Sequence, residues 1–307
     1  MSGARLVCEP WTIRGQKFEW GTQTFIMGIL NVTPDSFSDG GLFNTLSAAV
    51  TQAQHLVAGG AHILDIGGQS TRPQADQISL EAELERVIPV IQALRSHPAS
   101  ARADQQLDPV DPAAEKITAS VPISVDTTRA AVARAAIEAG ADLVNDISGA
   151  TYDPEMLLTV AELQVPIVLM HIRGTPKTMQ QLTDYQDVVG EIYDFLAQRT
   201  AAAVAAGVDP QKIILDPGIG FAKTYAQNLE ILRNVSKLRT LGCPILIGAS
   251  RKSFLGHILN QSDPKQRVFG TAAACCAAIA GGADILRVHD VAEISDVSRV
   301  SDAIWRN

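Results

Sequence analysis

Short apolar runs that end in polar residues recur along the chain. Residues 58–68 (AGGAHILDIGG), 138–149 (EAGADLVNDISG) and 280–290 (AGGADILRVHD) share this pattern, and residues 206–218 (AGVDPQKIILDPG) form a looser copy. In each copy a glycine is placed to end a helix, a few apolar residues suit a buried strand, and the strand finishes in a polar residue. The pattern predicts one half of a repeated unit, the half that runs from a helix into a strand.

The remaining apolar runs complete a set of eight strands. Four further strands are predicted at residues 25–30, 123–125, 167–170 and 245–248. Helical spacing of apolar residues fills the intervals, most clearly over residues 46–57, 80–94 and 291–304. Because strands and helices alternate with short joins, we predict an α/β fold, a closed (β/α)8 TIM barrel, in preference to an open doubly wound sheet. No GxGxxG motif follows a strand, which further disfavours the open sheet.

Two segments fall outside this repeat. Residues 9–20 (EPWTIRGQKFEW) predict a small hairpin that turns at Arg14-Gly15 and plugs the bottom of the barrel. Residues 97–120 contain three prolines and no sustained apolar stripe, so they predict a flexible surface insertion on the bottom face, without a chemical role. We therefore expect residues 1–307 to form a single barrel domain with one hairpin and one insertion.

Composition and charge narrow the possible partners. The chain is 46% hydrophobic and 5% aromatic, which suits helices packed on an aliphatic sheet, and its net charge is −8. Such a charge argues against a nucleic-acid or anionic membrane surface, so small molecules are the expected partners. The four cysteines show no metal-ligand spacing and are predicted to be reduced thiols in the core, and the N-terminal region lacks a long apolar run. A cytoplasmic location is the resulting expectation.

Polar residues collect at the points where the predicted strands end. Because the carboxyl ends of all strands meet at one mouth of such a barrel, their side chains should face a common space. They are Asn31, Asp65, Asp126, Asn145, Asp146, His171, Asp216, Lys252, Arg287 and His289. A single buried aspartate is as often a structural hydrogen-bond acceptor as a functional group. This many polar groups together are costly to desolvate unless a polar ligand lies between them.

The types of these residues indicate a ligand with two chemical parts. Asp126, Asn145 and Asp216 offer acceptors, and they suit a flat heterocycle with an amino-pyrimidinone edge because a carboxylate accepts two parallel N–H bonds. The cation of Lys252 belongs with this group. A surface ion pair is the alternative interpretation for the arginines considered next.

A second group of residues suits an anionic leaving group such as a phosphate. Arg72, Arg287 and His289 would form a cationic side that provides its donors, with Asn31 and a divalent cation assisting. The segment 250–253 (SRKS) is placed where a helix begins, so its amides suit a carboxylate. The residues alone leave the identity of both ligands open.

Seven ordered blocks carry these polar strand ends. They are GILNVTPDSFSDGG (28–41), GGQSTRP (67–73), SVDT (124–127), NDISG (145–149), DPGIGF (216–221), SRKS (250–253) and RVHD (287–290). Together they resemble the dihydropteroate synthase family, over about residues 25–290. The resemblance implies a TIM barrel that joins 4-aminobenzoate to 6-hydroxymethyl-7,8-dihydropterin diphosphate. The products would be pyrophosphate and 7,8-dihydropteroate, an intermediate of folate synthesis.

The resemblance also implies a role for each motif position. The pterin would be bound by Asp126, Asn145, Met170, Asp216 and Lys252. The diphosphate would be bound by Asn31, Thr71, Arg72, Arg287 and His289, with the cofactor Mg²⁺ held at Asn31. The 4-aminobenzoate would be bordered by Phe37, Thr71, Pro73, Phe221 and Ser253. The catalytic set would be Asp126, Asp216, Lys252, Arg287 and His289.

A dissociative mechanism is implied by the same resemblance. The diphosphate would leave first, and the weakly basic arylamine would capture a pterin-stabilised carbocation, with loops 33–41 and 68–76 closed over the second substrate. Members of the family commonly form homodimers through barrel helices, so a homodimer is expected here too.

Three positions depart from the usual family pattern. Gln69 stands where glutamate is more frequent, and Gln74 and Ala222 stand where glycine is more frequent. None of them removes a group assigned above. We expect Gln74 and Ala222 to stiffen their loops and Gln69 to remove a charge near a strand end.

Two other functions remain compatible with this fold. A methyltransferase barrel that uses a reduced folate would share the pterin-binding carboxylates, but it has no need for the diphosphate residues. A non-catalytic pterin-binding protein could use the same fold, because fold does not determine function. The intact set of polar residues argues against a degenerate site.

Overall fold

Eight parallel strands form the centre of the molecule in the computed structural model, which describes residues 8–33, 42–71, 75–96 and 119–306. The strands are β3 (Phe25–Asn31), β4 (Ile63–Gly67), β5 (Ile123–Asp126), β6 (Leu143–Asp146), β7 (Ile167–Met170), β8 (Ile213–Asp216), β9 (Leu246–Ile247) and β10 (Ile285–Val288). Their order is β8-β7-β6-β5-β4-β3-β10-β9, and a parallel bridge between Leu215 and Ile245 joins the two edges. The predicted (β/α)8 barrel is confirmed.

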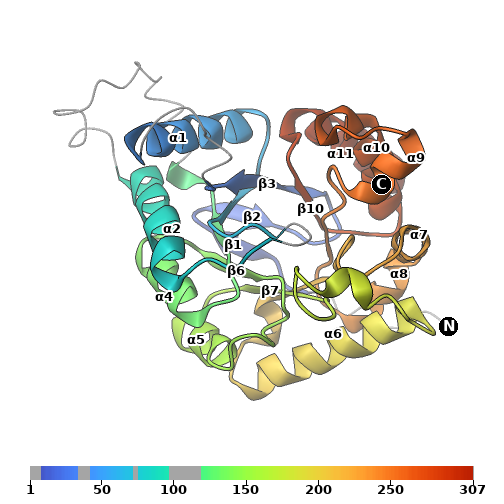
Figure 1. The fold of residues 1–307 in the computed structure, drawn as a ribbon, viewed down its shortest axis with the longest axis horizontal. Coiled ribbons are helices and arrows are strands. Elements are labelled where there is room, and N and C mark those ends of the chain that lie inside the picture. The colour runs from blue at the N-terminus through green and yellow to red at the C-terminus, as the bar shows by residue number, and fades with distance from the viewer. Residues whose placement is uncertain (1–7, 34–41, 72–74, 97–118, 307) are drawn as a thin grey trace.

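Helices surround these strands, as Figure 1 shows. They are α1 (Leu42–Ala58), α2 (Leu80–Arg95), α4 (Ala130–Glu138), α5 (Met156–Leu163), α6 (Val188–Ala205), α7 (Tyr225–Arg233), α8 (Val235–Leu238), α9 (Ser253–Leu259), α10 (Val268–Ala280) and α11 (Val291–Trp305). Side-chain caps fix the first residues of several helices. Ser79 accepts from the Ala82 amide, Asp187 accepts from the Gly190 amide, and Thr224 forms a reciprocal capping box with Gln227.

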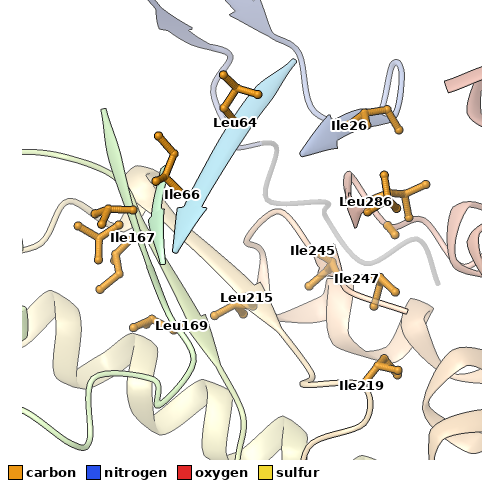
Figure 2. Packing of buried hydrophobic residues seen from close by; sticks show 14 of the residues in the cluster. Ile26, Leu64, Ile66, Ile167, Leu169, Leu215, Ile219, Ile245, Ile247 and Leu286 are labelled. Carbon is orange, nitrogen blue, oxygen red and sulfur yellow. The ribbon is translucent and has the colours of Figure 1, made fainter. Parts of the chain in front are cut away.

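Each strand buries both faces, which explains the nearly continuous apolar runs in the sequence. Ile26, Leu64, Leu169 and Leu286 belong to the large cluster that also includes buried helix residues, and Figure 2 shows part of its packing. Neighbouring positions such as Met27 belong to a second cluster. The two clusters alternate along the strands because successive side chains point to opposite faces.

The N-terminal hairpin covers one end of this second cluster. Strands β1 (Trp11–Ile13) and β2 (Gln16–Phe18) pair in antiparallel fashion. Arg14 and Gly15 form the turn with φ values of 51° and 80°, the combination that a tight two-residue hairpin turn requires. The cluster consists largely of residues near the starts of the barrel strands, so the hairpin lies at the bottom of the barrel as expected. The other predicted addition, residues 97–120, falls almost entirely outside the described residues.

The last helix differs from its expected packing. Val291 and Ile294 of α11 are buried, but Val300 and Ile304 on the same apolar stripe are each 63% exposed. The apolar stripe therefore extends beyond the surface that the barrel covers. Cys8, Cys243, Cys275 and Cys276 are free thiols, as predicted, but of the four only Cys275 is buried; the other three are partly exposed, so their predicted place in the core was wrong. Within the described ranges we find no helix with the length and apolar character needed to cross a membrane.

Candidate active site at the carboxyl ends of the strands

The strand register brings the polar strand ends to one side of the barrel. Asp126 at the end of β5 pairs in register with Gly67 of β4 and with Asn145 of β6. Asp216 ends β8 opposite Met170 of β7. A Cβ atom on Gly67 would lie 3.3 Å from the Asp126 Cβ. Because glycine has no side chain, the narrow space between β4 and the Asp126 carboxylate stays open. The barrel thus gathers four of the five residues assigned to pterin binding.

Arg287 connects two carboxylates inside the barrel mouth. Its Nε donates to Asp65 Oδ2 and its Nη2 donates to Asp126 Oδ2, both at 2.6 Å. Asn145 Nδ2 donates to the same Asp65 oxygen at 3.1 Å. Asp65 is fully buried, and the Arg287 side chain is 20% exposed. One guanidinium therefore serves two buried carboxylates, and the group keeps a net negative charge when both are ionised.

Burial shifts the protonation equilibria of the site carboxylates. Burial raises the pKa of Asp126 to about 7, against the opposing field of Arg287, and the negative charge of Asp65 contributes to the rise. Burial likewise raises the pKa of Asp216 to about 6, although the Gly218 amide donates to its Oδ1 at 2.7 Å and favours the anion. Both carboxylates are thus held near their titration point around neutral pH, as is common at functional sites.

Lys252 completes this side of the barrel mouth. It is the N-cap residue of α9, which confirms the predicted helix start at SRKS, and its Nζ lies 4.2 Å from the centre of the Phe221 ring. This distance permits a cation–π contact. Burial and the charge of Arg287 lower the pKa of Lys252 to about 8. Lys252 is therefore an ammonium at neutral pH that loses its proton in mildly alkaline solution.

His289 lies beside Ser250 at the end of β10. Its backbone amide donates to Ser250 Oγ at 3.2 Å, and its Nδ1 lies 3.1 Å from the same oxygen. Burial and the charge of Arg251 lower the pKa of His289 to about 3. The substrate-free protein therefore holds a neutral imidazole here, which contributes hydrogen bonding rather than the positive charge expected from the sequence.

Asn31 is the candidate metal ligand, and it ends β3 with partial exposure. Within the described ranges, no group of three His, Cys, Asp or Glu side chains is arranged to hold a metal ion. Mg²⁺ in phosphate-transfer sites commonly uses one or two protein oxygens together with substrate phosphates. An amide oxygen at the mouth of the barrel fits that type of binding.

The remaining assigned residues are placed unevenly. Thr71 is half-buried after β4, and Ser253 is the exposed first residue of α9. Phe221 is buried beside Met170 in a small apolar cluster. The other three assigned residues, Phe37, Arg72 and Pro73, lie outside the described residues.

Two of the polar residues at strand ends contact neighbouring turns and helices rather than the barrel mouth. Asp146 Oδ1 accepts from the backbone amide of Ser148 at 2.7 Å and from its hydroxyl at 2.6 Å. His171 packs edge-on against Phe195 of α6 at a centroid distance of 4.9 Å and lies 3.1 Å from Lys223 Nζ. These two residues are structural neighbours of the site.

Sequence reasoning gave no role to Asp65, although its buried carboxylate binds both Arg287 and Asn145. Its position at the polar end of a repeat was the available signal. Lys223, which follows the DPGIGF block, was missed entirely. An isolated lysine outside a strand end carries no pattern that distinguishes a buried ammonium from a surface one.

The structure also shows the surroundings of two of the departures from the family pattern. Ala222 is fully buried with φ of 52°, a left-handed conformation that costs a non-glycine residue about 1–2 kcal/mol. Gln69 Nε2 donates to the carbonyls of Ser70 and Asp76, each at 2.9 Å, and its Oε1 accepts from Ile78 at 2.8 Å. An ionised glutamate could not make the two donor contacts. Gln74 lies outside the described residues.

Comparison with known proteins places this geometry in a family. The family model for pterin binding enzymes matches residues 27–104 and 97–289. The dihydropteroate synthase of Synechocystis sp. is 58% identical over 297 residues, which cover 97% of this chain and 96% of that protein. The chain belongs to the dihydropteroate synthase family. Its predicted class, a transferase of folate biosynthesis, is confirmed by this relative.

Solved dihydropteroate synthases share the fold closely. The Xanthomonas albilineans synthase with 4-aminobenzoic acid is 41% identical with a TM-score of 0.82, covering 96% of this chain and 97% of that one. The synthase of the same organism in complex with 7,8-dihydropteroate is 38% identical with a TM-score of 0.80, covering 96% and 98%. These relatives are dihydropteroate synthases and not methyltransferases, so they favour the diphosphate-using member of the two enzyme classes considered.

Proposed function

We propose that this chain condenses 6-hydroxymethyl-7,8-dihydropterin diphosphate with 4-aminobenzoate to give 7,8-dihydropteroate and pyrophosphate. The observation that carries the proposal is the group formed by Arg287, Asp65, Asp126 and Asn145 at the mouth of a barrel of this family. A group of buried carboxylates with one shared guanidinium suits a ligand that brings N–H donors and develops positive charge.

The pterin is proposed to bind among Asp126, Asn145, Met170, Asp216 and Lys252. Carboxylates accept the parallel N–H bonds of an amino-pyrimidinone edge, and each accepts best when ionised. Lys252 can donate to ring acceptors, and the buried Met170 offers an apolar surface for the ring. The raised pKa values of Asp126 and Asp216 mean that a donor-rich ligand would favour deprotonation of both.

The diphosphate is proposed to lie toward Asn31, Thr71, Arg72, Arg287 and His289. Arginine forks match phosphate oxygens, and the neutral imidazole of His289 can donate one further hydrogen bond. Asn31 would hold Mg²⁺ together with the diphosphate, and bound Mg²⁺ would supply charge neutralisation of the leaving group. The Arg287 guanidinium already binds Asp65 and Asp126, so it would link the leaving-group side to the pterin side.

The 4-aminobenzoate is proposed to bind beside Phe37, Thr71, Pro73, Phe221 and Ser253. Ser253 begins α9, so its hydroxyl and the first amides of that helix suit a carboxylate. The Phe221 ring lies next to Lys252, which supports binding of the second substrate against the end of the pterin where the new bond would form.

The reaction is proposed to be dissociative. Departure of the diphosphate leaves a carbocation at the pterin methylene carbon, and Asp126 and Asp216 would stabilise the positive charge delocalised into the ring. The arylamine nitrogen then attacks that carbon and releases a proton. This sequence requires electrostatic preorganisation and exclusion of water more than a strong general base.

A turnover assay tests the proposed function directly. The purified chain is mixed with the pterin diphosphate, 4-aminobenzoate and Mg²⁺, and pyrophosphate and dihydropteroate are measured together. We expect equal amounts of both products, and loss of both when a chelator removes Mg²⁺. Failure of the folded protein to form either product would contradict the proposal.

The pKa shifts predict a bell-shaped dependence of kcat/KM on pH, a quantity that reports the free enzyme. Asp216 and Asp126 have pKa values of about 6 and about 7, so kcat/KM should rise with pH as they ionise. The ionised carboxylates bind the pterin and stabilise the carbocation formed from it. The value of kcat/KM should fall again near pH 8 as Lys252 loses its proton. A profile that is flat between pH 5 and 9 would contradict these roles.

Over the acid range, the free energy of unfolding should fall as pH rises, whereas kcat/KM should rise. The folded-state pKa values of both carboxylates are raised, so the native state binds more protons than the unfolded state. Their contribution to the free energy of unfolding is therefore complete below about pH 4 and is lost as pH rises through about 6 to 7. Denaturant titrations at matched pH values separate this trend from the activity profile.

A homodimer is proposed through the outer faces of α9, α10 and α11. Their exposed apolar side chains are Ile258, Leu259, Phe269, Val300 and Ile304, with Phe269 84% exposed. Apolar groups gathered in this way are typical of interaction sites.

The substitution Phe269→Glu tests this surface. It should shift the protein from dimer to monomer in sedimentation experiments, because a charge would be buried at the interface. Leu158→Glu on α5, where the native side chain is 49% exposed, is the matched control and should leave the dimer intact. Equal behaviour of the two variants would contradict the proposed interface.

The other partners are proposed to be the two small substrates alone. The net charge of −8 supports a protein without a nucleic-acid or membrane partner. A cytoplasmic location belongs to the same proposal, as does the organisation of residues 1–307 as one domain.

A further inference from the structure

Lys223 is a buried lysine that the reaction proposed above does not use. Its residue is 3% exposed, and among the described residues no carboxylate lies within ion-pair distance of its Nζ. Nζ instead lies 3.1 Å from His171 Nδ1 and donates to the carbonyl oxygen of Phe221 at 2.8 Å. Burial of an amine without an ion pair is unfavourable, so its position calls for a compensating role.

The segment that Lys223 contacts is a turn with an unusual backbone. Gly218, Gly220 and Ala222 have φ values of 71°, 85° and 52°. A Cβ atom on Gly218 would lie 2.0 Å from the carbonyl oxygen of His171, so the turn packs directly against the end of β7. Within the turn, Phe221 N donates to the Gly218 carbonyl at 3.0 Å. Such a conformation persists only when its surroundings hold it.

The turn positions two side chains of the proposed site. Phe221 contributes its backbone carbonyl to Lys223 and its ring to the contact with Lys252. A Cβ atom on Gly220 would also lie 2.9 Å from the Lys252 side chain, so the turn backbone limits where that side chain can go. A displacement of the turn would therefore move both a wall of the arylamine site and the ammonium beside the pterin.

His171 supplies the fixed acceptor for this contact. Burial, followed by the charges of Lys223 and Arg173, lowers the pKa of His171 to about 2, so the imidazole is neutral at pH 7 and one ring nitrogen is free to accept. Phe195 packs edge-on against the ring and limits its rotation. Burial also lowers the pKa of Lys223, but both hydrogen bonds use N–H donors that the ammonium and the neutral amine each possess.

We propose that Lys223 is a positioning residue that ties the Gly218–Ala222 turn to His171 at the end of β7, and so holds Phe221 and Lys252 in place for both substrates. This inference rests on the proposed function for its kinetic consequences. The tether itself is a property of the substrate-free protein and can be measured without turnover.

The variant Lys223→Met keeps the length of the side chain and removes its donors. Amide exchange over residues 217–224 should accelerate about tenfold or more, while exchange over residues 285–288 stays unchanged. The KM values for both substrates should rise about tenfold, with kcat changed less, because the turn would still reach its working position in part of the molecules. A general loss of folded protein would instead lower kcat and leave KM unchanged. Lys177→Met, at a position where the native side chain is 69% exposed, is the matched control.

A pair of His171 variants tests the acceptor and remains informative if Lys223→Met does not fold. His171→Asn keeps an acceptor oxygen and should retain KM within about threefold, whereas His171→Leu removes it and should resemble Lys223→Met. The proposal would be overturned if His171→Asn and His171→Leu had equal effects on KM. It would also be overturned if Lys223→Met showed the amide exchange rates and KM values of the wild type. Wild-type turnover measured alongside keeps the two proposals separate. An inactive wild type contradicts the proposed function, and the exchange comparison still decides the tether.

Discussion

Replacing Asp126 by asparagine should leave the barrel folded and lower kcat by about two to three orders of magnitude. The amide has the size of the carboxylate, but it cannot accept two parallel N–H bonds and has no charge to stabilise a cation. Arg287 keeps its bond to Asp65 in this variant. Because burial raises the pKa of Asp126 to about 7, a neutral group is well tolerated there, and stability at pH 8 should equal or exceed that of the wild type.

Asp142→Asn is the matched control for this experiment. Asp142 lies at the opposite end of the barrel, just before β6, where it binds Arg95 at 2.6 Å and Arg14 at 2.7 Å. Its replacement should lower the unfolding midpoint and leave kcat nearly unchanged. The two variants thus separate catalysis from stability. Turnover of Asp126→Asn within about threefold of wild type would contradict the role of this carboxylate.

The barrel could be predicted from the sequence because one local pattern repeats along it. The glycine, the apolar run and the polar end in residues 58–68, 138–149 and 280–290 each predicted a strand that the structure contains. The stripe on the last helix was a weaker guide. Apolar spacing marks a helix face, but it does not say whether that face meets the barrel or lies exposed, as Val300 does.

The sequence could predict which polar residues lie at the strand ends, but it could not predict the contacts between them. Position at a strand end indicated Asp126 and Asp216 correctly as neighbours of one mouth. It could not indicate that Arg287 binds Asp65 and Asp126, since strands far apart in sequence bring these groups together. The protonation states of the site residues could not be predicted from the sequence either, because they depend on burial in the packed structure.

Replacing Arg287 by methionine should have the largest effect on stability. Asp65 and Asp126 would remain buried without their shared cation, and loss of one partner of a buried ion pair costs about 3–5 kcal/mol. The loss should be greater at pH 8 than at pH 6. Without the guanidinium the pKa of Asp126 rises further, so protonation of this carboxylate relieves the variant at low pH. Denaturant unfolding at both pH values measures the effect.

The exposed pair between Arg134 and Glu162 provides the control for Arg287. The side chains of this pair are 42% and 64% exposed, and such surface pairs contribute less than about 1 kcal/mol. Arg134→Met should therefore unfold nearly like the wild type at either pH. If Arg287→Met were equally stable, the shared-cation description of the site would be wrong.

The order of bond breaking is the claim on which the electrostatic account depends. If a pterin carbocation forms before the arylamine attacks, then diphosphate can leave, rotate and return when 4-aminobenzoate is absent. The direct measurement is positional isotope exchange. A pterin diphosphate that carries ¹⁸O in the bridge between the pterin methylene carbon and the first phosphorus is incubated with the protein and Mg²⁺ alone. The label is expected to migrate into the non-bridging oxygens of the same phosphate, and to migrate much more slowly with Asp126→Asn. Absence of migration in protein that turns over normally once 4-aminobenzoate is added would contradict this order of bond breaking.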